Sequence, residues 1–82
     1  VIIVGDIYHP DAVLADIERE ALLAVNRLIQ ANCLKIGARL APIFETFQGR
    51  EQEFLCLQIE PTLQGARAIA GLFRSAFNAD AA

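Results

Sequence analysis

The chain has 82 residues, a length that suits one small domain and excludes a two-domain organisation. Apolar residues make up 55% of it and charged residues 21%, which excludes intrinsic disorder and is a high apolar share for so short a chain. The net charge is −3 and the seven basic residues form no cluster, so no nucleic-acid partner is expected.

Residues 1–4, Val-Ile-Ile-Val, form a β-branched apolar run that ends at Gly5-Asp6. Because the run lacks polar alternation, it predicts a strand covered on both faces, as in a parallel sheet. An amino terminus inside such a strand is unusual, since its charge must stay solvated, and the sequence contains no Met. We therefore expect a piece of a longer protein.

A long amphipathic helix is predicted after Pro10. Asp11 or Asp16 can cap its start, and Gly37 suits its C-terminal end. Steps of three and four residues predict one apolar stripe on it: Leu14, Ile17, Ala21, Val25, Leu28, Ile29, Cys33 and Ile36. In an alternative interpretation, this helix is the binding face of a small, unrelated protein-interaction module.

A second, short strand is predicted over residues 39–44, where Pro42 removes a backbone donor and places the strand at an edge or marks its start. Residues 45–53 are polar and predict a loop with one helical turn near its beginning. The apolar run 54–57 is too short to assign to a helix or a strand, and we expect it to pack the loop onto the core.

A final helix is predicted after Pro61, with Thr62 as its N-cap and Gly65 as its third residue. Glycine inside a helix costs about 1 kcal/mol relative to alanine. We therefore expect Gly65 and Ala66 to be packing residues rather than ligand contacts. The predicted apolar face is Leu63, Ala66, Ile69, Leu72, Phe73 and Phe77.

The order strand, long helix, short strand, loop, helix predicts an α/β fold with a partial parallel sheet, in one small domain or fragment of a larger domain over residues 1–82. Two strands are too few for a stable sheet, so further strands must come from additional chain or from another copy. Together with the apolar surplus, this predicts a homo-oligomer, with a dimer as the commonest form.

Groups for catalysis are few. His9, the one histidine, follows the first strand in Asp6-Ile7-Tyr8-His9-Pro10, and open α/β sheets bind ligands at the carboxyl ends of their strands. Asp6 and His9 are therefore weak candidates for acid and base chemistry; alternatively, Asp6 only accepts hydrogen bonds in the turn. Neither a phosphate loop nor metal-ligand spacing is present, so we expect no cofactor and no metal.

Cys33 and Cys56 lie in apolar stretches, which predicts buried, free thiols rather than a disulfide or a nucleophile. Ser75 lies within the final helix without the sharp turn of a nucleophilic serine, and is expected to be structural. The sequence shows no signal peptide and no apolar run of about 20 residues. These features favour a cytoplasmic location and no membrane span.

Two passages taken together resemble the C-terminal part of the SGNH hydrolases, the GDSL-type lipases and esterases. Residues 1–10, Val-Ile-Ile-Val-Gly-Asp-Ile-Tyr-His-Pro, are similar to that family's fourth strand and the Tyr-Asn-Pro-like turn after it. Residues 59–70, Ile-Glu-Pro-Thr-Leu-Gln-Gly-Ala-Arg-Ala-Ile-Ala, are similar to its Ile-His-Pro block and last helix. Residues 25–29 and 37–47 resemble the elements between. The resemblance spans nearly the whole chain and implies a flavodoxin-like topology.

The resemblance also implies a loss of catalysis, because the family's Asp-x-x-His falls on Leu57 and Glu60. The serine and oxyanion donors of the family belong to blocks that this sequence does not contain. We expect a catalytically inert fragment or remnant with a structural or self-association role. One alternative is the C-terminal piece of an active esterase whose serine lies in a part of the polypeptide that this sequence does not include. A different alignment places Asp6 and His9 in the catalytic block, although the helix after His9 lacks the family's glycine.

Overall fold

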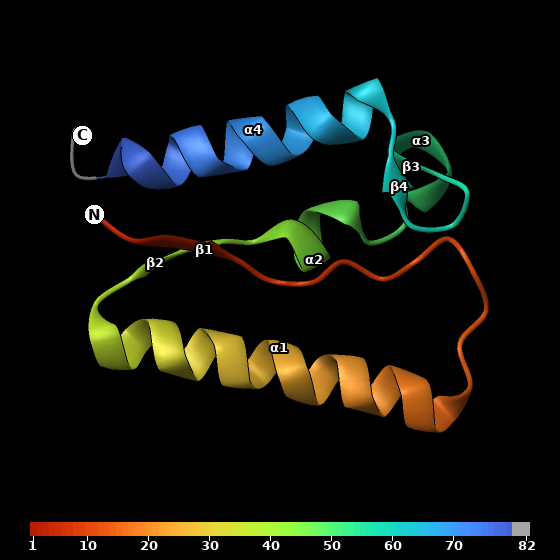
Figure 1. Cartoon of the computed structure of the whole chain (residues 1–82), viewed down its shortest axis with the longest axis horizontal. Helices are drawn as coiled ribbons and strands as arrows, with labels where there is room; N and C mark the ends of the chain where they lie inside the picture. Colours follow the sequence, from red (N-terminus) through yellow and green to blue (C-terminus); the bar gives the residue numbers. More distant parts are fainter. Residues whose placement is uncertain (80–82) are drawn as a thin grey trace.

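Two long helices lie on opposite faces of a small parallel sheet in the computed structural model, which describes residues 1–79 (Figure 1). Strand β1 (Ile3–Gly5) pairs in parallel with β2 (Arg39–Ala41). Helix α1 (Asp16–Ile36) connects the two strands on one face, and α4 (Leu63–Phe77) covers the other. The predicted α/β class and partial parallel sheet are confirmed.

The strand β1 is less covered than its sequence predicts. Val1 and Ile2 precede it, Val1 is 79% exposed, and the residues of β1 are only half-buried. The helices cover the two faces of the sheet, but no strand among the described residues pairs with the second edge of β1. An apolar run therefore did not mean complete burial here, because burial also requires neighbours along the sheet.

The predicted C-terminal end of α1 is confirmed, but its predicted N-cap is wrong. Neither Asp11 nor Asp16 caps it, contrary to the prediction; Ala15 is the N-cap, and its N–H donates to Glu18 Oε1 at 2.9 Å. At the other end Gly37 has a φ of 69° and donates its N–H to the Cys33 carbonyl, as predicted. Glycine adopts this left-handed conformation without the steric cost of a Cβ atom.

Most of the apolar stripe predicted for α1 is not buried, contrary to the prediction. Its members Ile17, Val25, Leu28 and Ile36 are all exposed. The fully buried residues of α1 are Asn26 and Cys33. A two-stranded sheet is narrow and covers only a narrow strip of a helix, so the remainder of the apolar surface stays in solvent.

The second strand is shorter than the predicted range 39–44, and the helical turn predicted after it is present as a short helix. The strand ends before Pro42, which is the N-cap of α2. Short elements then occupy much of the predicted loop and the segment up to Pro61: α2 (Ile43–Phe47), α3 (Glu51–Phe54), β3 (Leu55–Cys56) and β4 (Glu60–Pro61). Strands β3 and β4 pair antiparallel. Phe54 and Leu55 are buried, so this run packs onto the core as predicted.

The hydrophobic core lies on the α4 side of the sheet. Its centre is Phe47, which is 0% exposed, with the Tyr8 and Phe54 rings at centroid distances of 5.2 and 4.8 Å. The other buried members are Ile43 and Leu55. Residues packed around them are Tyr8, Ala68, Ile69, Leu72 and Phe73.

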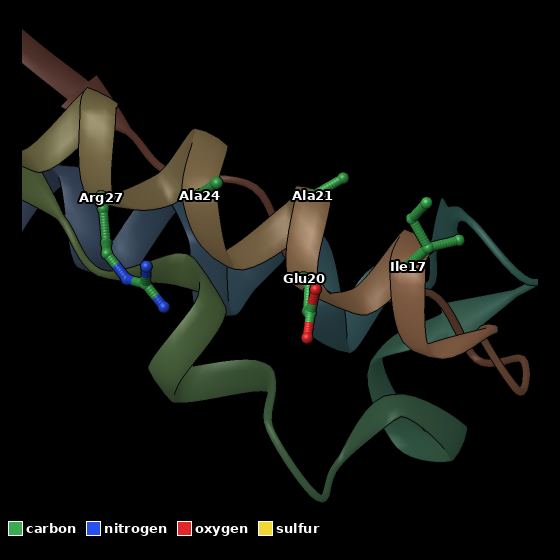
Figure 2. A pocket seen from close by; sticks show the side chains of 5 residues that line it. All are labelled: Ile17, Glu20, Ala21, Ala24 and Arg27. Atoms are coloured by element: carbon green, nitrogen blue, oxygen red, sulfur yellow. The ribbon is translucent and has the colours of Figure 1, made fainter.

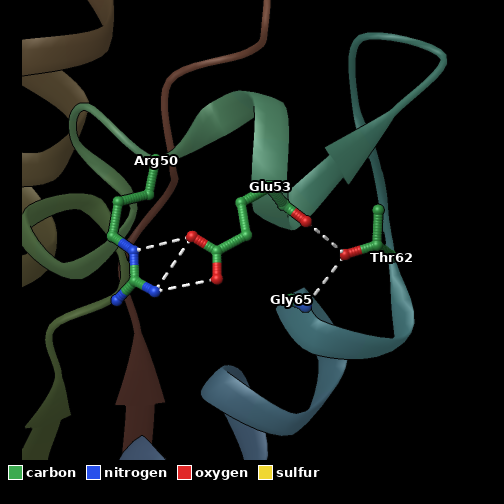
Figure 3. Close-up of polar contacts among 4 residues, drawn as sticks. All are labelled: Arg50, Glu53, Thr62 and Gly65. Carbon is green, nitrogen blue, oxygen red and sulfur yellow. Dashed lines mark hydrogen bonds and ion pairs between the residues drawn. The ribbon is translucent and has the colours of Figure 1, made fainter.

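The start of α4 is held by Thr62, the predicted N-cap. Thr62 Oγ1 accepts from Gly65 N at 3.1 Å and donates to the Glu53 carbonyl at 2.8 Å (Figure 3). A Cβ atom on Gly65 would lie only 3.2 Å from Phe54 Cα, and its nearest contact would be the Phe54 carbonyl oxygen. Gly65 is thus a packing residue as predicted, whereas Ala66 is exposed and is not.

Candidate functional site

Asp6, at the carboxyl end of β1, is 6% exposed and ties this strand to α2. Its Oδ1 accepts a hydrogen bond from Phe44 N at 2.9 Å, and its own N–H extends the ladder to the Ala41 carbonyl at 3.4 Å. Phe44 lies in the first turn of α2, where backbone N–H groups have no partner within the helix. The carboxylate therefore has a structural task.

Asn26 holds the chain immediately after Asp6, and sequence reasoning missed it. Its Nδ2 donates to the Ile7 carbonyl and its Oδ1 accepts from Ile7 N, both at 2.8 Å. One side-chain amide thus satisfies both backbone groups of a residue that has left the sheet. The available signal was an Asn between apolar residues of the predicted α1.

His9 follows two residues after Ile7 and is half-buried. Its Nδ1 is 2.6 Å from the Pro10 carbonyl oxygen. A carbonyl only accepts, so Nδ1 must carry the proton in this contact and Nε2 holds the free lone pair of the neutral ring. Among residues 1–79 no hydrogen bond joins His9 to Asp6, so the structure brings the two candidates to one end of β1 but not into a pair.

A surface hollow opens beside His9, between α1 and the α2–α3 region. It is lined by His9, Arg19, Leu23, Phe44, Gln48 and Glu51. The lining holds an imidazole, a carboxylate and a guanidinium, which suffice to bind a polar molecule or transfer a proton. Triad-type acyl transfer additionally needs an activated hydroxyl or thiol, and this lining contains neither.

Leu57 and Glu60, the positions that the family resemblance aligns with a catalytic Asp and His, belong to the β3–β4 hairpin. Leu57 is 84% exposed and has a φ of 51°, and Glu60 is also exposed. The hairpin rests on the segment after β1: Tyr8 Oη donates to the Ile59 carbonyl at 2.6 Å, and Asp11 N donates to the Gln58 carbonyl at 2.8 Å. The aligned positions therefore lie on a hairpin at the same end of the sheet as His9.

No protein-family model, no curated protein and no solved structure matches this chain.

A second hollow lies on α1 alone. Its lining residues are Ile17, Glu20, Ala21, Ala24 and Arg27, and Figure 2 shows all of them on successive turns of this one helix. The hollow exists because alanines leave space between longer side chains. With no second element as an opposite wall, it cannot enclose a ligand.

The remaining reactive side chains do not gather into a site. Both cysteines are free; Cys33 is buried as predicted, but Cys56 is exposed, contrary to the prediction, because β3 turns it away from the core. Ser75 is exposed on α4. Within the described part of the chain, no three His, Cys, Asp or Glu side chains are placed to hold a metal ion. No described helix is long and apolar enough to cross a membrane.

Proposed function

We propose that this chain is a catalytically inert, SGNH-like structural module that works by self-association. The observation that carries the proposal is a parallel sheet of two strands, β1 and β2, whose outer edges pair with nothing in the described residues. Large apolar side chains are exposed on both long helices, among them Leu28 and Phe77. Free edges and exposed apolar area both favour assembly with more protein.

Three features of the carboxyl end of β1 support inertness. The Asp6 carboxylate is engaged with the backbone of α2 through its bond to Phe44 N. Among residues 1–79 no carboxylate is hydrogen-bonded to His9, whose Nδ1 meets the Pro10 carbonyl instead, so its ring lacks the acidic partner of a triad. Leu57 and Glu60 supply neither the acid nor the imidazole of the family's block.

Self-association is tested by size-exclusion chromatography with light scattering at micromolar concentration. The expected mass is that of a dimer or a larger assembly. A well-folded species at the 9.0 kDa of a single chain would refute the proposed role.

Inertness is tested with short-chain aryl esters. The expected rate equals that of buffer, since the serine of a triad carries most of its catalysis. The matched control is His9→Ala, whose rate should also equal that of buffer. Turnover that disappears in His9→Ala would refute inertness and favour a piece of an active esterase.

A further inference from the structure

The two open edges of the sheet expose different backbone groups. Arg39 N donates to the Ile2 carbonyl at 2.8 Å, and Asp6 N donates to the Ala41 carbonyl. In a parallel ladder the N–H and C=O of one residue point to the same side, and successive residues alternate between sides. The backbone groups of Ile3 and Gly5 therefore point out of the free edge of β1, and those of Leu40 out of the free edge of β2.

The free edge of β2 is flanked by helix sides of mixed polarity, because the hollow beside it is lined by Cys33, Leu34, Ala38 and Leu40 as well as Gln30. Gln30 and Leu34 of α1 line this hollow with Leu40, which places this side of α1 next to β2. Helical spacing adds Glu20 and Arg27 to the same side. The side of α4 that is turned from β1 carries Gln64, Gly71 and Ser75. This edge therefore has more polar neighbours on the outer turns of both helices than the edge of β1, although the hollow next to it is apolar.

The free edge of β1 is flanked by apolar helix sides. The side of α1 turned away from Leu34 carries Val25 and Ile36, with Leu28 and the polar Asn32 next to them. On α4, a Cβ atom at Gly5 would lie 3.3 Å from the Phe73 ring, so the side with Phe73 faces β1. Helical spacing places further apolar residues of α4 there. The resulting surface, here called the β1 face, consists of Ile3, Val25, Leu28, Ile36, Ala70 and Phe77.

We propose that a second copy of this chain docks on the β1 face, with the two β1 strands antiparallel about a twofold axis at Val4. This inference rests on the proposed self-association and names its surface. Val4 is the middle residue of β1, so this register pairs the whole strand. Ile3 then lies opposite Gly5 of the second copy, where both residues direct their backbone groups outwards. The product is a four-stranded sheet in the order β2, β1, β1, β2.

The charges of the β1 face are compatible with a second copy. A twofold axis sets α1 beside α1 and α4 beside α4, so the apolar sides meet. On this side of α1 the charged residue of the first turns is Glu18, and its carboxylate already accepts the N–H of Ala15. Like-charge repulsion between the two α1 helices is therefore small. On α4, Arg67 and Arg74 lie one turn from Ala70 at the exposed rim of the face, where charges stay solvated.

The area of the β1 face is also sufficient. The molecule measures 38 × 28 × 15 Å, and the view down the shortest axis shows β1 and β2 overlapping between the helices (Figure 1). The free sheet edges therefore belong to the two broad sides of the molecule, and a rectangle of 38 × 28 Å encloses the side that contains the β1 face. A stable interface takes about 800 Å² from each partner.

Two exposed leucines on different sides of α1, about 120° apart around the helix, test the proposal. Leu28 on the β1 face is 63% exposed, and Leu34 beside β2 is 85% exposed. We expect Leu28→Glu to raise the dissociation constant of the dimer at least about tenfold, because each copy would bury an unpaired charge. Leu34→Glu is the matched control and should leave it unchanged. Sedimentation over a dilution series measures both, and circular dichroism verifies that both variants fold.

Amide hydrogen exchange tests the strand pairing itself. The Ile3 and Gly5 amides should exchange at least about tenfold more slowly above the dissociation constant than below it, because pairing protects them. The Leu40 amide, on the other edge, should be unaffected. Protection of Leu40 alone, or of none of the three, would overturn the proposed register.

The outcomes separate the two proposals. A monomeric wild-type chain would reject both. If the wild-type chain is a dimer that Leu28→Glu does not weaken, self-association is retained and the β1 face is rejected. This holds whether or not Leu34→Glu weakens the dimer.

Discussion

Each face of the sheet is covered by one long helix, but the two sides are packed very differently. On the α4 side, α2 and α3 join the helix, and Ile43, Phe47, Phe54 and Leu55 form a buried cluster. On the α1 side, the longest helix of the described residues contributes Asn26 and Cys33 as its fully buried residues. Helix α4 itself contributes Gly65 as its fully buried residue, so the cluster on this side comes from the short elements packed between α4 and the sheet. The packing of each side thus depends on how many elements meet there rather than on the length of its helix.

This difference predicts where stability resides. A buried aromatic cluster contributes several kcal/mol, while a helix held by a side-chain amide and a few half-buried contacts contributes little. Substitutions on the α4 side should therefore cost more than substitutions on the α1 side.

The largest effect is expected for Phe47→Ala in the α4-side cluster. Removing a fully buried phenylalanine ring costs about 3–5 kcal/mol of unfolding free energy, and here two ring contacts are lost with it. Leu34→Ala on α1 is the comparison and should stay within about 0.5 kcal/mol. Urea denaturation measures both. Equal losses would mean that the two sides of the sheet do not differ in packing.

The next effect is expected for Gly65→Ala at the start of α4. The added methyl group meets the Phe54 backbone, so the melting temperature should fall by the equivalent of about 1–3 kcal/mol despite the better helix propensity. Gly71→Ala is the matched control in the same helix. A Cβ atom at Gly71 meets nothing within 4 Å, so this variant should gain up to about 1 kcal/mol. A raised melting temperature for Gly65→Ala would show that α4 is not packed on Phe54.

On the α1 side, Asn26→Ala should cost about 1 kcal/mol, because two backbone groups of Ile7 lose their partner but lie near enough to solvent to find water. The clearest readout is faster hydrogen exchange of the Ile7 amide. Asn32→Ala, at an exposed position of the same helix, should change neither quantity. A loss as large as that of Phe47→Ala would contradict the weak attachment of α1.

The smallest effect is expected at the surface ion pair near the start of α4. Arg50 and Glu53 are joined at 2.9 Å with both side chains about half exposed (Figure 3). Glu53→Gln should therefore cost no more than about 0.5 kcal/mol, and the difference should vanish in 1 M salt. Arg50→Ala should cost more, since the guanidinium also lies 4.3 Å from the centroid of the Phe54 ring. If Arg50→Ala cost no more stability than Glu53→Gln, the contact between Arg50 and the Phe54 ring would contribute nothing measurable.

Features that depend on a few consecutive residues were predictable. Gly37 ends α1 and Thr62 caps α4 because both act through backbone geometry within one helical turn. The prediction of the α1 cap was wrong, although it too concerned a few consecutive residues. Two aspartates were available within six residues, but the carboxylate that accepts the N–H of the N-cap residue belongs to Glu18, inside the helix. At the candidate site, the sequence indicated that Asp6 and His9 follow one strand, but Asp6 bonds to Phe44, 38 residues away.

The sequence by itself determined the order of the long elements, the parallel pairing and the packed glycine of α4, since periodicity, caps and steric size are properties of short segments. Only the tertiary structure decided which apolar residues are buried. Leu28 and Cys33 belong to the same predicted stripe, yet Leu28 is exposed and Cys33 is buried. Burial is decided by elements that are distant in sequence, and a sheet of two strands covers one strip of α1 and leaves the β1 face open.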